Sequence, residues 1–235
     1  CEIYAMTRDE RFREPAQKAI DYCVASQGPP GGWKYIPQSR DSDVSVTGWI
    51  VMALMSAKMA KLDVPESTLN NVTRYLDSVG RDGGSRYPYM EGYEVTLPMT
   101  AEALLCREYL GWEYDDERLL SGLEWITDES HLINYEKGRD VYYWYYATQA
   151  THHMGGSSTF WKRWNNVMKQ KVPEQQVKGG KEDGSWDPYR PTRDAWAEEG
   201  GRLYVTCLSV YMLEVYWRHM PLYEHNAFGV AGQKF

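Results

Sequence analysis

The chain lacks several features that mark large classes of proteins. Its 235 residues carry a net charge of −7, and lysine and arginine nowhere form a block. Nucleic-acid-binding proteins neutralise phosphates with clustered basic side chains, so no nucleic acid is expected as a partner. The longest nearly apolar stretch, residues 44–57, is too short to cross a bilayer, which predicts that the chain has no transmembrane segment.

The cysteines argue against two common kinds of site. Cys1, Cys23, Cys106 and Cys207 are far apart and lack the spacing of zinc ligands or of a disulfide-rich framework. We expect small buried residues within helices, with no metal and no cofactor. The cysteines do not indicate in which cellular compartment the protein resides.

Phenylalanine is scarce, with 4 residues, whereas the chain has 10 tryptophans and 19 tyrosines. Tyr and Trp combine a large apolar body with a polar tip, and they therefore suit the half-buried wall of a cavity or groove. Packing between helices is the alternative use of the same side chains.

Proline, glycine and capping residues divide the chain into segments with helical periodicity. The residues before 7 indicate the last turns of a helix whose start is missing. Eight further helices are predicted at about 15–27, 46–61, 63–80, 97–110, 115–126, 141–153, 159–171 and 203–219.

Two kinds of helix alternate along the chain. The second, fourth, sixth and eighth of these are apolar nearly all round, which predicts helices enclosed by other protein, and the others carry a single apolar face. An inner ring of helices wrapped by an outer ring produces this alternation. The same number of residues separates Trp49 from Trp144 and Val72 from Val167, which indicates a regular repeat.

A glycine–aromatic loop recurs before the enclosed helices. Gly31-Gly32-Trp33 precedes the stretch from Asp41 to Trp49, and Asp183-Gly184-Ser185-Trp186 precedes Tyr204-Val205-Thr206. This pattern resembles the prenyltransferase and squalene-oxidase repeat of terpene cyclases and protein prenyltransferase β subunits, and it is most similar to uncharacterised bacterial members of that group. The resemblance covers nearly the whole chain.

The resemblance implies an all-α fold, an α/α toroid in which helical hairpins place apolar helices inside and amphipathic helices outside. About four hairpins are visible, whereas toroids of this group usually hold more. Residues 1–235 are therefore expected to be a single toroid domain, the C-terminal part of a longer chain that lacks its N-terminal repeats.

The catalytic groups of these families are only partly present. Terpene cyclases of this type protonate an alkene with an Asp-x-Asp-Asp motif, and the matching residues are Asp41, Ser42, Asp43 and Val44. Asp41 and Asp43 are thus candidate acids, while capping of the following helix by Asp43 or Ser45 is the competing role.

Protein prenyltransferases hold zinc with an Asp-x-Cys pair and a later His. The matching positions are Asp140, Tyr142 and Val205, so a thiolate and an imidazole are both missing. Zinc-dependent prenyl transfer is not expected.

Other residues are candidates for ligand binding, because they lie in the glycine–aromatic loops or on the enclosed helices, where helix packing is again the alternative. They are Trp33, Trp49, Tyr87, Asp140, Tyr142, Trp144, Trp186 and Tyr204. Four arginines that precede enclosed helices, Arg40, Arg86, Arg139 and Arg202, either gather to bind an anion or form ion pairs at the rim.

Three functions are compatible with these observations. The first is a non-catalytic toroid that binds an apolar or isoprenoid small molecule or a protein segment. The second is a cyclase-like enzyme that uses Asp41 or Asp43 as its acid. The third is a carbohydrate-binding or polysaccharide-cleaving toroid, indicated by the Trp186-Asp187 loop with Asp194 and Glu198.

Overall fold

The computed structural model describes residues 1–217, and all regular secondary structure within that range is helical. The α-helices are α1 (Glu2–Thr7), α2 (Arg13–Ala25), α3 (Val44–Met59), α4 (Glu66–Val79), α5 (Leu97–Tyr109), α6 (Glu117–Ile126), α7 (Val141–His153), α8 (Thr159–Glu174) and α9 (Ala197–Leu213). Short 3-10 turns lie at Glu10–Phe12, Asp82–Gly84, Glu129–His131 and Glu214–Tyr216. The all-α prediction is therefore confirmed.

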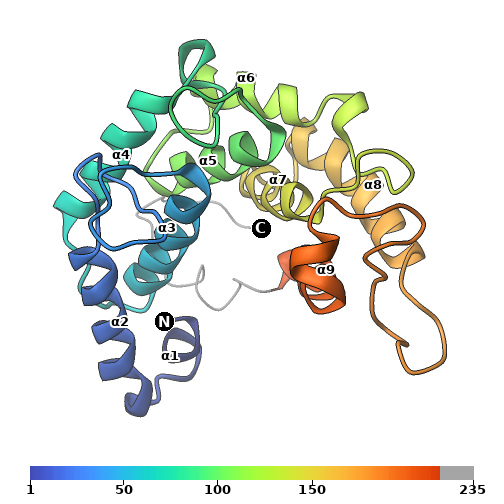
Figure 1. Ribbon diagram of the computed structural model, residues 1–235, viewed down its shortest axis with the longest axis horizontal. Coiled ribbons are helices and arrows are strands. Elements are labelled where there is room, and N and C mark those ends of the chain that lie inside the picture. Colours follow the sequence, from blue (N-terminus) through green and yellow to red (C-terminus); the bar gives the residue numbers. More distant parts are fainter. Residues whose placement is uncertain (218–235) are drawn as a thin grey trace.

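The helices form two layers that curve together into an arc (Figure 1). In the inner layer, α3 packs on α5, α5 on α7 and α7 on α9. The outer layer consists of α2, α4, α6 and α8, and α1 packs against α3 at one end. Within the described residues the arc stays open between α1 and α9 (Figure 1).

Burial follows the predicted alternation. Every residue of α7 from Val141 to Thr151 is buried, because α5 and α9 flank this helix and α8 covers it. The outer helix α4 instead buries one stripe that includes Leu69, Val72 and Leu76. Enclosure on several sides explains why the inner helices can do without a polar face.

Several predicted helix starts differ from the observed ones by two residues or more, and two of the differences have clear local reasons. Helix α3 begins at Val44 rather than 46, because the Oδ1 atom of Asp43 accepts a hydrogen bond from the Val46 N–H group and makes Asp43 the N-cap. Helix α9 begins at Ala197 rather than 203 and continues through a break at Gly201, whose φ of 61° lies in the left-handed region. Residues 218 and 219 of that prediction lie outside the described range.

A third glycine–aromatic loop, Gly83-Gly84-Ser85-Arg86-Tyr87, precedes α5, and all three loops share one contact with the inner layer. The N–H groups of Trp33, Tyr87 and Trp186 donate to the Oγ1 atoms of Thr47, Thr100 and Thr206, over 3.0, 3.0 and 3.1 Å. Each loop is thereby fixed to the inner helix that follows it.

Two of these loops also reach the outer layer. The indole Nε1 of Trp33 donates to the Cys23 carbonyl at the end of α2, over 2.8 Å, and that of Trp186 donates to the Val172 carbonyl of α8, over 2.7 Å. The repeated loop is therefore a device that ties the two layers together.

The equal spacing of Trp49 and Trp144 does not mark equivalent positions. Trp144 is closer to its N-cap, Asp140, than Trp49 is to Asp43. Trp144 is 2% exposed and packs on Tyr135 at 4.9 Å between ring centroids, whereas Trp49 is 41% exposed. The two tryptophans therefore occupy different faces of the inner layer.

The shared loop contact can be tested by removing the hydroxyl acceptor. We expect Thr47→Val and Thr100→Val each to lower the free energy of unfolding by about 1–3 kcal/mol, since a buried N–H group loses its partner. Chemical denaturation measures the change. Thr73→Val is the control, because the Thr73 hydroxyl bonds only to the Leu69 carbonyl of its own helix, and equal losses in all three variants would contradict this role.

Candidate functional site

Four aromatic side chains from two inner helices meet over the helix between them. Trp49 of α3 stacks on Tyr145 of α7, with ring centroids 5.9 Å apart and planes 14° apart. It also makes edge contacts with Tyr142 at 6.3 Å and Tyr146 at 5.7 Å. Because α5 lies between α3 and α7, these four residues, the aromatic cluster, bridge across α5.

The aromatic cluster continues toward α9. Tyr142 lies 6.4 Å from Trp196, the N-cap of α9, and Tyr145 lies 6.1 Å from Tyr211. Trp49, Trp196 and Tyr211 are 41%, 46% and 37% exposed. The cluster together with Trp196 and Tyr211 forms an inner aromatic surface, in which these three exposed rings lie against the buried tyrosines of α7.

A carboxyl group is buried beside the cluster. Glu102 of α5 is fully buried, and its Oε2 atom accepts a hydrogen bond from the Tyr142 hydroxyl over 2.9 Å. Glu102 Oε1 and the Tyr146 hydroxyl make no hydrogen bond of regular geometry with a described residue, although the Tyr146 hydroxyl is near enough to Glu102 to lower its pKa. Buried polar atoms are rarely left in this state, so the pair marks a site that calls for an explanation.

Glycine at position 48 makes room for this carboxyl group. A Cβ atom on Gly48 would lie 2.1 Å from Glu102 Oε1 and 2.5 Å from its Cδ. Helix α3 therefore approaches the Glu102 side chain with bare backbone.

The surroundings of Glu102 favour its neutral form. Burial raises the pKa of Glu102 well above its usual range, and the negative charge of Asp43 adds to the increase, although the Tyr142 hydrogen bond acts in the opposite direction. An acid with a strongly raised pKa among aromatic rings is typical of functional sites.

The two candidate acids lie in contrasting environments. Asp43 is fully buried, and its Oδ2 atom accepts from the Tyr89 hydroxyl over 2.9 Å while its Oδ1 atom caps α3. Burial raises the pKa of Asp43. The Asp41 side chain is 67% exposed, and its nearest cation is Lys34, at 3.7 Å. The structure therefore gives Asp43 the capping role and leaves Asp41 in solvent.

Asp140 occupies the corresponding place on α7. Its Oδ1 atom accepts from the Tyr143 N–H group over 3.1 Å, and burial raises its pKa to about 6. Tyr204 of α9 is near enough that, after burial, Asp140 is the main cause of its raised pKa. Among the predicted ligand-binding residues, Trp49 and Tyr142 thus meet directly, and Asp140 acts on Tyr204 through its charge.

The remaining predicted ligand-binding residues lie in the hydrophobic core. Trp33, Tyr87, Trp144 and Trp186 are at most 3% exposed. Their contacts with the Thr side chains and with Tyr135 account for this burial, so they pack the layers and do not reach the inner aromatic surface.

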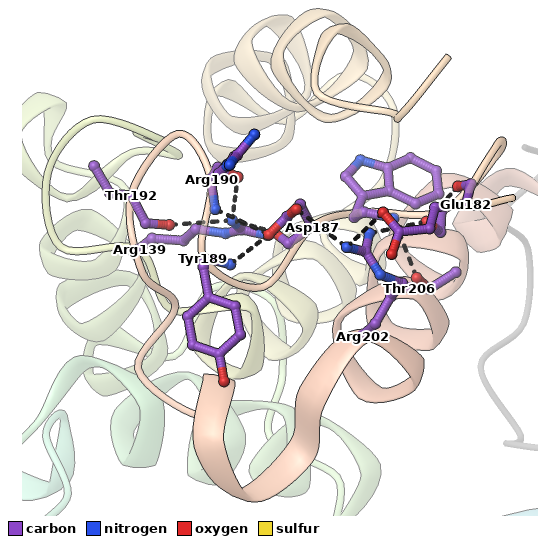
Figure 2. A network of polar contacts seen from close by, with 10 residues as sticks. Arg139, Glu182, Asp187, Tyr189, Arg190, Thr192, Arg202 and Thr206 are labelled. Carbon is purple, nitrogen blue, oxygen red and sulfur yellow. Dashed lines mark hydrogen bonds and ion pairs between the residues drawn. The ribbon is translucent and has the colours of Figure 1, made fainter. Parts of the chain in front are cut away.

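The loop between α8 and α9 is held by arginines, as Figure 2 shows. The buried Arg139 donates through Nη1 to the carbonyls of Asp187 and Arg190, over 2.7 and 2.8 Å, and its Nε lies 3.6 Å from Asp194. Arg202 pairs with Asp187 at 3.1 Å and with Glu182 at 2.9 Å (Figure 2). These two arginines therefore form ion pairs rather than a shared anion site, and Asp187 and Asp194 are engaged within the loop.

The prediction that no segment crosses a membrane is confirmed within the described residues, whereas the expectation that the cysteines are buried is wrong for three of the four. Here no helix combines the length and apolar character that a membrane crossing requires. Across residues 1–217, no group of three or more His, Cys, Asp and Glu side chains is arranged to hold a metal ion. The four cysteines are free thiols, but only Cys106 is buried, whereas the other three are partly exposed.

Comparisons of the chain with protein-family models, with curated proteins and with solved structures found no match.

Sequence reasoning missed the most unusual residue of the site. Glu102 stands alone as a charged residue within residues 99–106 of an otherwise apolar and small-residue helix. A charge inside a helix predicted to be enclosed was the signal that could have revealed it.

Gly48→Ala tests the tight approach of α3 to Glu102. Alanine favours a helix by about 0.5–1 kcal/mol over glycine, but overpacking a core costs about 1–3 kcal/mol. Since the Glu102 side chain is fully buried, we expect the second effect to dominate and the free energy of unfolding to fall in chemical denaturation. Gly156→Ala, where a Cβ atom meets no atom within 4 Å, should leave stability nearly unchanged.

Glu102→Gln tests the neutral state of the carboxyl group. A pKa that is raised in the folded state means that the native protein retains a proton the unfolded chain releases, so wild-type stability falls as pH rises above about 4.3. The glutamine side chain does not ionise, so the variant does not lose stability in this way as the pH rises. We therefore expect its stability relative to wild type to increase between pH 4.5 and 8, by up to about 1.4 kcal/mol per pH unit.

Denaturation across that pH range measures the effect. The control is Glu94→Gln, because Glu94 is exposed. A difference between Glu102→Gln and wild type that does not vary with pH would show that Glu102 ionises as freely as in the unfolded chain.

Proposed function

We propose that this protein is a non-catalytic member of the squalene-cyclase and prenyltransferase repeat group, and that it binds an apolar small molecule on its inner aromatic surface. The resemblance of the glycine–aromatic loops supports the group and its toroid architecture. The two curved layers are compatible with that architecture.

One observation carries the binding proposal. Trp49 is 41% exposed although it belongs to an inner helix and its ring packs against three tyrosine rings. Large aromatic side chains that are rigidly supported and still open to solvent are typical of residues that dominate binding energy. Trp196 and Tyr211 extend the same apolar surface on the α9 side.

The environment of the predicted acids supports the absence of cyclase chemistry. A proton donor for an alkene needs a dry site that faces the substrate. Asp41 is solvated, and both oxygens of Asp43 are occupied, one by the helix cap and one by Tyr89.

A cyclase-like enzyme is the second candidate, and Glu102 is the observation that favours it. This carboxyl group has the raised pKa of an acid and contacts Tyr142, a member of the aromatic cluster. Turnover of an isoprenoid that Glu102→Gln abolishes would replace the binding proposal with this one. The carbohydrate hypothesis receives less support, since Asp187 is paired with Arg202 and Asp194 with Arg139.

Trp49→Ala tests the binding proposal. We expect the affinity for farnesol or geranylgeraniol, measured by isothermal titration calorimetry, to fall at least about tenfold, the effect of losing one well-packed aromatic contact. Tyr22→Ala is the control, because Tyr22 is 64% exposed but belongs to the outer helix α2. Equal affinity of both variants, or wild-type binding of oligosaccharides alone, would contradict the proposal.

A further inference from the structure

Three consecutive inner helices each contribute a carboxyl group to the same region. Asp43 caps α3, Glu102 lies within α5 and Asp140 caps α7. Asp43 is close enough to raise the pKa of Glu102, and Glu102 and Asp140 both raise that of Tyr204. The three carboxyl groups therefore act on a common region between the inner helices.

None of these carboxyl groups takes part in an ion pair with another described residue. Arg139 is adjacent to Asp140 in the chain, but its guanidinium group turns to the α8–α9 loop and to Asp194. Lys34 acts on Asp43 only from a distance and lies nearest Asp41. Asp43 and Glu102 are completely buried, and a carboxyl group that is buried without a cation either stays protonated or is stabilised in its ionised form by a positive charge nearby.

The aromatic cluster lies over the same region. Tyr142 connects the two features, since its hydroxyl bonds to Glu102 while its ring contacts Trp49 and Trp196. The faces of aromatic rings carry negative electrostatic potential and attract cations within about 6 Å of the ring centre. The Tyr146 hydroxyl is also near enough to Glu102 to act on its pKa, so two tyrosines of the aromatic cluster face this carboxyl group.

We infer that the inner aromatic surface recognises an organic cation, so that the ligand carries a quaternary or protonated amine. The inference rests on the proposed function and names the class of its ligand. Aromatic faces and nearby carboxyl groups both favour positive charge, whereas a neutral ligand gains only from the apolar contact. An anionic ligand such as a diphosphate is disfavoured by the same groups.

Binding of a cation should be linked to release of a proton. A nearby positive charge favours the ionised carboxylate, so a carboxyl group that is neutral in the free protein gives up its proton when the ligand binds. The titratable groups around Glu102 are Asp43 from α3, Cys106 from α5, Tyr142 and Tyr146 from α7 and Tyr204 from α9. All of these are acids, so the affinity should rise with pH between 5 and 8.

Choline and its neutral isostere 3,3-dimethylbutan-1-ol separate charge from shape. We expect choline to bind the full chain at least about tenfold more tightly in an NMR titration, with affinity that increases with pH. Glu102→Gln keeps a side chain of the same shape, and Asp43→Asn keeps a good N-cap, so both variants should fold. Each should reduce the preference for choline severalfold, whereas Glu94→Gln should not.

The outcomes separate this inference from the proposed function. Equal or tighter binding of the neutral alcohol would overturn cation recognition and leave an apolar binding surface in place. Binding of farnesol without binding of choline would do the same. Failure of farnesol and of both small probes would overturn the proposed function together with the inference.

Discussion

The close approach of the inner helices is the constraint on which the rest of the structure depends. Helix α5 is packed between α3 and α7. This packing is possible because small side chains and the backbone of Gly48 make the contacts. Ala101 and Ala103 of α5 and Ala147 and Ala150 of α7 are completely buried. Small residues at a contact let the axes of two helices come close together. Because the inner helices pack closely and the outer helices lie behind them, the two layers curve into an arc.

That same closeness creates the site. An arc of inner helices brings α3 and α7 near each other in front of α5, so Trp49 can reach three tyrosines of a helix that is not its immediate neighbour. The rings then seal Glu102 from water. The stability that the aromatic contacts provide is partly offset by the cost of burying a carboxyl group, a combination that is common where a site is prepared for a ligand.

The loops serve the layers rather than the site. Trp33 and Trp186 look like binding residues in the sequence because they follow glycines and precede inner helices. Their indole N–H groups nevertheless donate to carbonyls of outer helices, and their backbone N–H groups donate to threonines of inner helices. The motif recurs because α3, α5 and α9 are each fixed to the preceding loop in the same way, which is a structural requirement and carries no information about a ligand.

The sequence by itself determined the helices, their alternation between enclosed and one-faced types, and Asp43 as a candidate cap of α3, since all of these depend on neighbours within a few residues. It also placed Trp49 and Tyr142 among the candidates for a cavity wall. Only the tertiary structure decided which aromatic residues meet and which are core. Trp49 and Trp144 both belong to helices predicted to be enclosed, but Trp49 is partly exposed beside the tyrosines of α7, whereas Trp144 is buried against Tyr135. The role of Glu102 likewise depends on α3, α5 and α7 together, because burial and the loss of a counter-charge are properties of packing between helices that are distant in sequence.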